Sequence, residues 1–135
     1  MSLSPLLSAP FVIQIHAFAA AAAFALGIVQ FAAPKGTMPH RTLGWIWVVL
    51  MLTISVSSFW IHGHSFRLWR SWSPIHLLSI FALIMLALGV AAAWQHRVRA
   101  HRLTMISIFA GALLIAGIFT LVPGRIMHAV LFGKP

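Results

Sequence analysis

Four histidines recur in this chain at an almost regular spacing. His16 and His40 are 24 residues apart, and His76 and His101 are 25 residues apart. An imidazole nitrogen can ligate a metal or haem iron, and it can carry a proton near neutral pH. One long apolar stretch lies between the two histidines of each pair. If each stretch crosses a membrane, His16 and His76 lie near one membrane face and His40 and His101 near the other.

The remaining composition limits the chemistry that these histidines can support. The 135 residues are 61% hydrophobic and include nine Lys or Arg, no Asp or Glu, and no Cys. Without carboxylates, the chain lacks the paired acids of a hydrolase, the acidic relay of a typical proton pump, and the oxygen donors of calcium and magnesium sites. Without cysteine, it forms no disulfide, thiolate site or iron–sulfur cluster. Chemistry at the imidazoles is what remains.

Four apolar runs must position the histidines. They cover approximately residues 10–33, 43–61, 77–94 and 103–122. Each is close to the ~20 residues that a helix needs to cross the hydrocarbon of a bilayer. Short links join the runs, so residues 1–135 are expected to form one all-α domain, an integral membrane four-helix bundle with up-down topology. The tail, residues 123–135, is expected to lie along the headgroups as an interfacial segment.

The two halves of the chain resemble tandem copies of one helix pair. Besides the histidines, Leu26-Gly27 and Leu88-Gly89 occupy similar positions late in the first helix of each half. In an up-down bundle the first and third helices are diagonal, as are the second and fourth. Two imidazoles that ligate one haem need helices farther apart than close neighbours. The pattern therefore predicts one bis-histidine site near each membrane face.

Small residues follow His16 along its helix face. They stand three, four, seven and eleven residues further on, and are Ala19, Ala20, Ala23 and Gly27. Such a trough could hold the edge of a porphyrin, but it also suits close packing of two helices. Gly44, four residues after His40, similarly leaves room beside that ring.

Other histidines in the chain could form a different kind of metal site. Zinc or copper needs three or four ligands that converge on one point. His62 and His64, with His76, could supply these, so His62 and His64 are alternate ligands. On the opposite face, His96 is a further alternate ligand.

Three arginines stand next to or near histidines at helix ends. Arg41 directly follows His40, Arg102 directly follows His101, and Arg125 stands three residues before His128 at the start of the C-terminal tail. No carboxylate in the chain can neutralise them, so they are expected to bind a haem propionate or an anionic substrate such as a quinol headgroup. The alternative is the phosphate of anionic lipids. Nucleic acid is not expected, because the cations flank apolar spans and form no continuous basic surface.

The cations also bear on orientation. We define face A as the face with the N-terminus, the link between the second and third spans, and the tail; face B holds the other two links, residues 34–42 and 95–102. The cations of face A are Arg67, Arg70, Arg125 and Lys134. Those of face B are Lys35, Arg41, Arg97, Arg99 and Arg102. The positive-inside rule therefore favours a cytoplasmic face B, in a bacterial inner membrane.

The tryptophans fit the same picture of a membrane protein. They lie near predicted helix ends, where an aromatic belt is expected. These residues are Trp45, Trp47, Trp60, Trp69, Trp72 and Trp94.

Three segments of the chain resemble a bacterial family of small uncharacterised four-helix membrane proteins, a domain of unknown function. They are HRTLG from His40 to Gly44, HRLTM from His101 to Met105, and VPGRIMH from Val122 to His128. The resemblance covers essentially the whole chain. It implies four membrane helices and carries no activity.

In its ligand pattern, the chain is also similar to transmembrane di-haem b-type cytochromes linked to ascorbate, quinol or superoxide. That family has a four-helix core with one histidine pair on the first and third helices and another on the second and fourth. His16, His76, His40 and His101 match this pattern. The chain departs from it in its small size, in lacking flanking helices, and in histidines nearer to the helix starts.

These observations favour a membrane cytochrome that binds haem b, with two bis-histidine haems, and exchanges electrons with quinol or a small oxidant. If it is an enzyme, it is an oxidoreductase of the b-type cytochrome kind. Two alternatives are a histidine-lined carrier or channel for a metal, an anion or protons, and a non-catalytic accessory membrane subunit. The lipid bilayer is the expected partner, and the sequence is also compatible with a homo-oligomer.

Overall fold

The structure, a computed structural model, describes residues 1–61 and 74–133. Every element within these ranges is a helix, and four helices are long and apolar enough to cross a membrane. Span 1 is α2 (Phe11–Ala32), and span 2 is α3 (Met38–Ser57) continued by the 3-10 turn η1 (Ser58–Trp60). Span 3 is α4 (Pro74–Trp94). Span 4 joins α5 (Val98–Ile108), the π-helical segment η2 (Phe109–Ile115) and α6 (Ala116–Phe119). The predicted all-α fold is confirmed.

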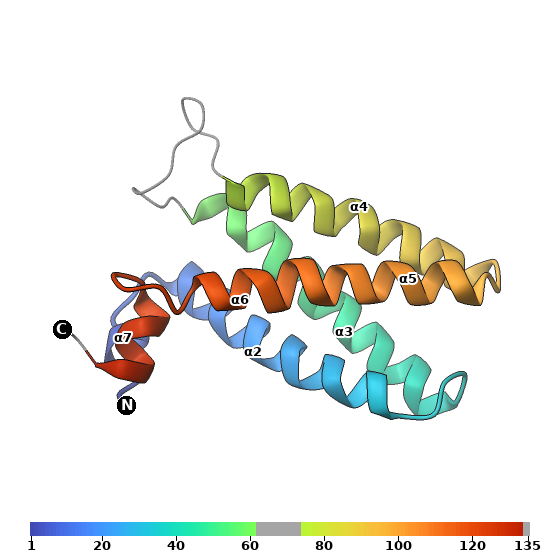
Figure 1. The fold of residues 1–135 in the computed structure, drawn as a ribbon, viewed down its shortest axis with the longest axis horizontal. Helices are drawn as coiled ribbons and strands as arrows, with labels where there is room; N and C mark the ends of the chain where they lie inside the picture. Colours follow the sequence, from blue (N-terminus) through green and yellow to red (C-terminus); the bar gives the residue numbers. More distant parts are fainter. Residues whose placement is uncertain (62–73, 134–135) are drawn as a thin grey trace.

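The spans form an up-down bundle (Figure 1). The most extensive contacts join span 1 to span 2 and span 3 to span 4, and further contacts join spans 2 and 3 and spans 4 and 1. Spans 1 and 3 are therefore diagonal, as are spans 2 and 4, which agrees with the predicted topology. The turns of face B lie at one end of the bundle and both termini at the other.

Spans 2, 3 and 4 begin earlier in the sequence than predicted. Span 2 begins at Met38, because the Thr37 hydroxyl caps the helix by accepting a hydrogen bond from the His40 backbone N–H (3.3 Å) and Pro39 suits its first turn. Span 4 begins at Val98. As a result, the link of face B that was predicted over residues 34–42 shrinks to residues 33–37. Hydropathy marks the part of a helix that can lie in hydrocarbon, and the polar first turns extend beyond it.

A left-handed histidine makes the turn between spans 3 and 4. His96 has a φ of 56°, and the Arg97 N–H bonds to the Ala92 carbonyl (2.8 Å) while the His96 N–H bonds to the Ala93 carbonyl (3.1 Å). This is the hydrogen-bond pattern of a Schellman motif, in which glycine usually occupies the left-handed position. The turn therefore forms without a glycine or proline.

The centre of the bundle is a small apolar core around Met51 and Ile108. Trp47 belongs to this core, where it is 5% exposed and its indole N–H donates to the Ala23 carbonyl (2.9 Å). The predicted aromatic-belt role is therefore wrong for Trp47. By contrast, Trp60 and Trp94 are exposed at helix ends, and Trp45 is exposed two turns into α3. Trp69 and Trp72 lie outside the described residues.

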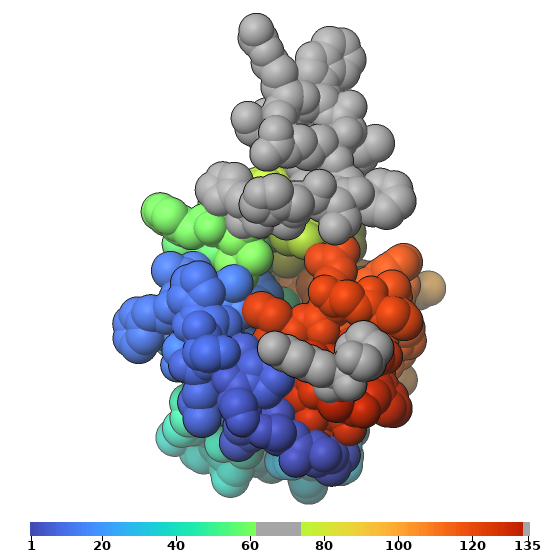
Figure 2. Space-filling view, turned by 90° about the vertical axis from the view of Figure 1, so that its left-hand side faces the viewer, coloured from blue at the N-terminus to red at the C-terminus, as the bar shows by residue number. Residues whose placement is uncertain are grey.

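The two ends of the chain pack together at face A. The short helix α1 (Ser4–Leu7) contacts α7 (Ile126–Phe132), and the Ser2 N–H bonds to the Val130 carbonyl (3.0 Å). Figure 2 views this end of the molecule, with the N-terminal segment in blue beside the C-terminal helix in red. The predicted interfacial tail is thus a helix held by the N-terminal segment. The sequence predicted an interfacial segment here, but it did not reveal this partner.

Candidate functional site

On face B, His40 is held by the side chain of Gln30, near the end of span 1. Gln30 Nε2 donates to the His40 backbone carbonyl (2.9 Å), so the other amide atom, Oε1, faces His40 Nδ1 at 2.9 Å. Because an amide oxygen can only accept, His40 carries its proton on Nδ1. The lone pair of the neutral ring is therefore on Nε2. Gly44 makes room for the Gln30 amide beside His40, since a Cβ at Gly44 would lie 3.2 Å from Gln30 Nε2.

His101, also on face B, is held by a backbone group of span 3. Its Nδ1 lies 2.8 Å from the carbonyl oxygen of Gly89. A carbonyl oxygen accepts and never donates, so His101 is also protonated on Nδ1 and has its lone pair on Nε2. A Cβ on Gly89 would collide with Met105 and would lie 2.8 Å from Thr104 Oγ1. The glycine lets spans 3 and 4 approach closely enough for this hydrogen bond.

The fold brings His40 and His101 to the same end of the bundle from diagonal spans. Both side chains are half-buried. Face B therefore presents two imidazoles whose Nδ1 atoms donate to oxygen atoms.

On face A, His16 is held by a serine at the end of α3. His16 Nδ1 lies 2.9 Å from Ser57 Oγ, whose own proton is donated to the Ile54 carbonyl (3.1 Å). His16 and Ser57 thus share a polar cluster with the Ile54 carbonyl at the end of α3. His16 is half-buried within span 1.

His76 lies on the other side of the end of span 2. It is 9% exposed, and its ring lies against Phe59, with ring centroids 5.7 Å apart. One turn later, Ser79 Oγ is 2.5 Å from Ser58 Oγ, which joins spans 3 and 2. The end of span 2 thus contacts His16 through Ser57 and His76 through Phe59.

The sequence pattern identified the histidines but not the other polar residues of the spans, of which Gln30 holds His40 and Ser57 contacts His16. These residues could have been found as polar side chains inside apolar spans, where each needs a hydrogen-bond partner. They are Gln30, Ser55, Ser57, Ser58 and Ser79, and the last four lie near the face-A end of spans 2 and 3.

The alternate ligands do not form a metal site among the described residues. Within residues 1–61 and 74–133, no group of three or more histidines could hold a metal ion. His96 is exposed in its turn. His62 and His64 lie outside the described residues, as does the zinc or copper site predicted from them.

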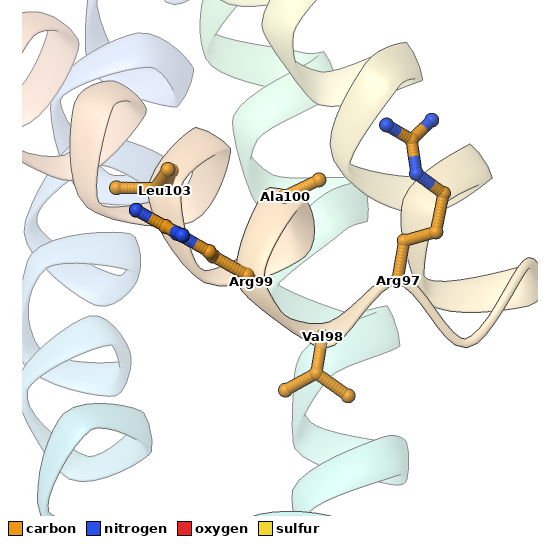
Figure 3. A pocket seen from close by; sticks show the side chains of 5 residues that line it. All are labelled: Arg97, Val98, Arg99, Ala100 and Leu103. Atoms are coloured by element: carbon orange, nitrogen blue, oxygen red, sulfur yellow. The ribbon is translucent and has the colours of Figure 1, made fainter.

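Arg41, Arg102 and Arg125 are all exposed. The two other arginines of face B, Arg97 and Arg99, line a shallow pocket of about 380 Å³. Figure 3 shows their side chains pointing apart, Arg99 towards Leu103 and Arg97 along the neighbouring helix. This pair is therefore not a clamp for a single anion.

Lys35 has a different role from the arginines of face B. Its ammonium group donates to the carbonyls of Gln30, Phe31 and Ala33, at 2.8, 2.7 and 2.6 Å. Positive charge at this end of a helix is favourable, because it faces unpaired carbonyl groups. Lys35 therefore caps the end of span 1.

The trough beside His16 is filled by other helices. A Cβ on Gly27 would lie 2.6 Å from Phe109 Cε2 and 3.2 Å from Trp47 Nε1. Phe109 also stacks on Phe24, with ring centroids 5.4 Å apart. Of the two interpretations of this trough, close helix packing is confirmed, and no room for a porphyrin edge remains at Gly27.

Comparison with known proteins identifies the family. No curated protein and no solved structure matches the chain. The family described as "Predicted membrane protein (DUF2306)" matches residues 13–132. With its four apolar helices, this chain belongs to that family of transmembrane four-helix proteins.

Proposed function

We propose that this protein is a membrane electron carrier that binds two b-type haems. His40 and His101 ligate one haem at face B, and His16 and His76 ligate the other at face A. The protein exchanges electrons with quinol or a small oxidant.

The observation that carries this proposal is the state of the imidazoles at face B. His40 and His101 reach the same end of the bundle from diagonal spans, and each donates Nδ1–H to an oxygen atom. Histidines that ligate a metal usually have such a hydrogen bond, which leaves Nε2 for the metal. At face A, His16 Nδ1 is also hydrogen-bonded to an oxygen atom, the hydroxyl of Ser57. These donor groups fit haem iron, which accepts two axial imidazoles.

Haem iron supplies a one-electron couple when it is bound. The protein's part is to hold the iron with two histidines, so that no position is left open for oxygen, and to set the charge around it. Arg41 and Arg102 at face B, and Arg125 at face A, are the cations placed to bind haem propionates. A planar guanidinium forms two parallel hydrogen bonds with a carboxylate.

Substitution of single histidines tests the proposal. Alanine at either histidine of one face should halve the haem content and leave the spectrum of the other haem unchanged. As a control, His128→Ala should retain both haems, because His128 lies against Phe132 in the C-terminal helix. If His62→Ala or His64→Ala removes the face-A haem while His16→Ala does not, the ligand assigned to that face is wrong.

One observation favours a second candidate, a proton carrier. At face A, the hydroxyls of Ser58 and Ser79 are paired in a buried position, near His16 and His76. Hydroxyls and imidazoles can relay protons. This candidate predicts proton uptake into vesicles by the colourless protein, and its loss in Ser79→Ala.

The proposal places the protein in a bacterial inner membrane, with face B in the cytoplasm among anionic lipids. Since the chain has no cysteine, single cysteines can report its orientation. The thiol reagent should cross the outer membrane but not the inner membrane. It should label Leu3→Cys in intact cells, and it should label Gln95→Cys only after the inner membrane is made permeable. The reverse pattern would contradict the orientation.

A further inference from the structure

Gln30 is a polar residue close to the end of an apolar span, and its whole amide is engaged by one histidine. Its Nε2 donates to the His40 carbonyl and its Oε1 accepts from His40 Nδ1, both at 2.9 Å. The two bonds fix the orientation of the amide as well as that of the ring. They also tie the end of span 1 to the first turn of span 2.

The corresponding histidine of the second half is held differently. His101 donates to the backbone carbonyl of Gly89, which no side-chain substitution can remove. In both halves, however, the acceptor comes from the first helix of the same helix pair. His40 is therefore the face-B histidine whose orientation depends on a side chain.

The space around Gln30 is shaped for this role. Gly44 faces the amide, and a Cβ there would approach Nε2 to 3.2 Å. Lys35 caps the carbonyl of Gln30 itself (2.8 Å). The backbone and the side chain of Gln30 are thus both held in place, so the amide presents its oxygen to His40 in one position.

We propose that Gln30 is a positioning residue that fixes His40 in the Nδ1-protonated form and keeps Nε2 available as a ligand. An imidazole in water populates both tautomers, and a permanent acceptor at Nδ1 selects one of them. In metal sites, loss of such a partner typically weakens metal binding by roughly 10- to 100-fold. The role of Gln30 in haem binding rests on the proposed function, but its control of the His40 tautomer does not.

The tautomer can be measured directly. In protein with ¹⁵N-labelled histidine, purified without haem, the nitrogen shifts of His40 should report protonation at Nδ1; the His40→Gln variant assigns the signals. Gln30→Leu should convert His40 to a mixture of tautomers. Gln30→Glu should restore the Nδ1-protonated form, because a carboxylate oxygen also accepts. Gln95→Leu, in the exposed turn of face B, is the matched control and should change nothing.

A second measurement links the tautomer to haem. In the haem-loaded protein, Gln30→Leu should weaken retention of the face-B haem by roughly 10- to 100-fold and shift its midpoint potential, while the face-A haem is unchanged. Gln30→Glu should retain the haem with a lowered potential.

The outcomes separate the inference from the proposed function. If His40 keeps the Nδ1-protonated form in Gln30→Leu, the positioning role is overturned, whatever the haem content. If wild type and variants show the expected tautomers but no preparation binds haem, the positioning of His40 stands and the cytochrome proposal fails. If Gln30→Leu folds poorly, the His40 tautomer can be compared between Gln30→Glu and Gln30→Met. Both side chains are close in size to glutamine, but only glutamate has an oxygen that can accept from His40.

Discussion

The close approach of spans 1 and 4 at Gly27 can be tested by adding one carbon atom. Alanine usually stabilises a helix relative to glycine by about 0.8–1 kcal/mol. At Gly27, however, the new Cβ would lie 2.6 Å from Phe109 Cε2 and 3.2 Å from Trp47 Nε1. Both neighbours are rigid rings, so one of the spans must shift. Overpacking of this kind costs about 1–3 kcal/mol.

Gly117 provides a matched control for this substitution. It also lies in a helix, and a Cβ there would have no neighbour within 4 Å. Because both variants replace a helical glycine by alanine, the difference between them reports chiefly on the close approach at Gly27. We expect Gly27→Ala to be less stable than Gly117→Ala by about 1–3 kcal/mol, or about 5- to 150-fold in the unfolding equilibrium.

Unfolding by sodium dodecyl sulfate in mixed micelles, followed by circular dichroism, measures this difference. If both variants shift the midpoint equally, Phe109 and Trp47 do not fill the trough beside Gly27. Its assignment to helix packing would then be refuted, and space for a porphyrin edge would be available beside span 1.

Three further predictions test other parts of the structure. His96→Gly should stabilise the protein by about 1 kcal/mol, because glycine adopts the left-handed conformation of this turn at lower cost; a lower thermal midpoint would contradict the turn. Trp47→Phe should cost about 1–3 kcal/mol in unfolding free energy through a lost hydrogen bond and a cavity, whereas Trp45→Phe, on an exposed side chain, should have little effect. Arg41→Lys and Arg102→Lys should shift the midpoint potential of the face-B haem; unchanged potentials would assign both residues to lipid phosphates.

The arrangement of the spans could be predicted because it depends on strong, local signals. Apolar runs of membrane-spanning length identified four helices, and short links made neighbouring helices antiparallel. The placement of His40 and His101 at one end, and of His16 and His76 at the other, followed from chain direction alone. These features need no knowledge of which helix face contacts which neighbour.

Contacts between particular helix faces could not be predicted in the same way. A row of small residues beside His16 is compatible with a ligand or a helix, and only the positions of Phe109 and Trp47 decide between them. Trp47 follows Trp45 by two residues, yet one points into the core and the other outwards, because they stand on different faces of the helix. Gln30 acquires its role from His40, ten residues later and on another helix.

The haem content of the purified protein is the most direct test of haem binding at the two histidine pairs. The protein should be purified from a host grown with ample haem, and its visible spectrum recorded before and after addition of dithionite. Two bis-histidine sites should give a red protein with a low-spin b-type spectrum and a haem-to-protein ratio approaching two. A colourless protein with a native helical circular dichroism spectrum would contradict this expectation.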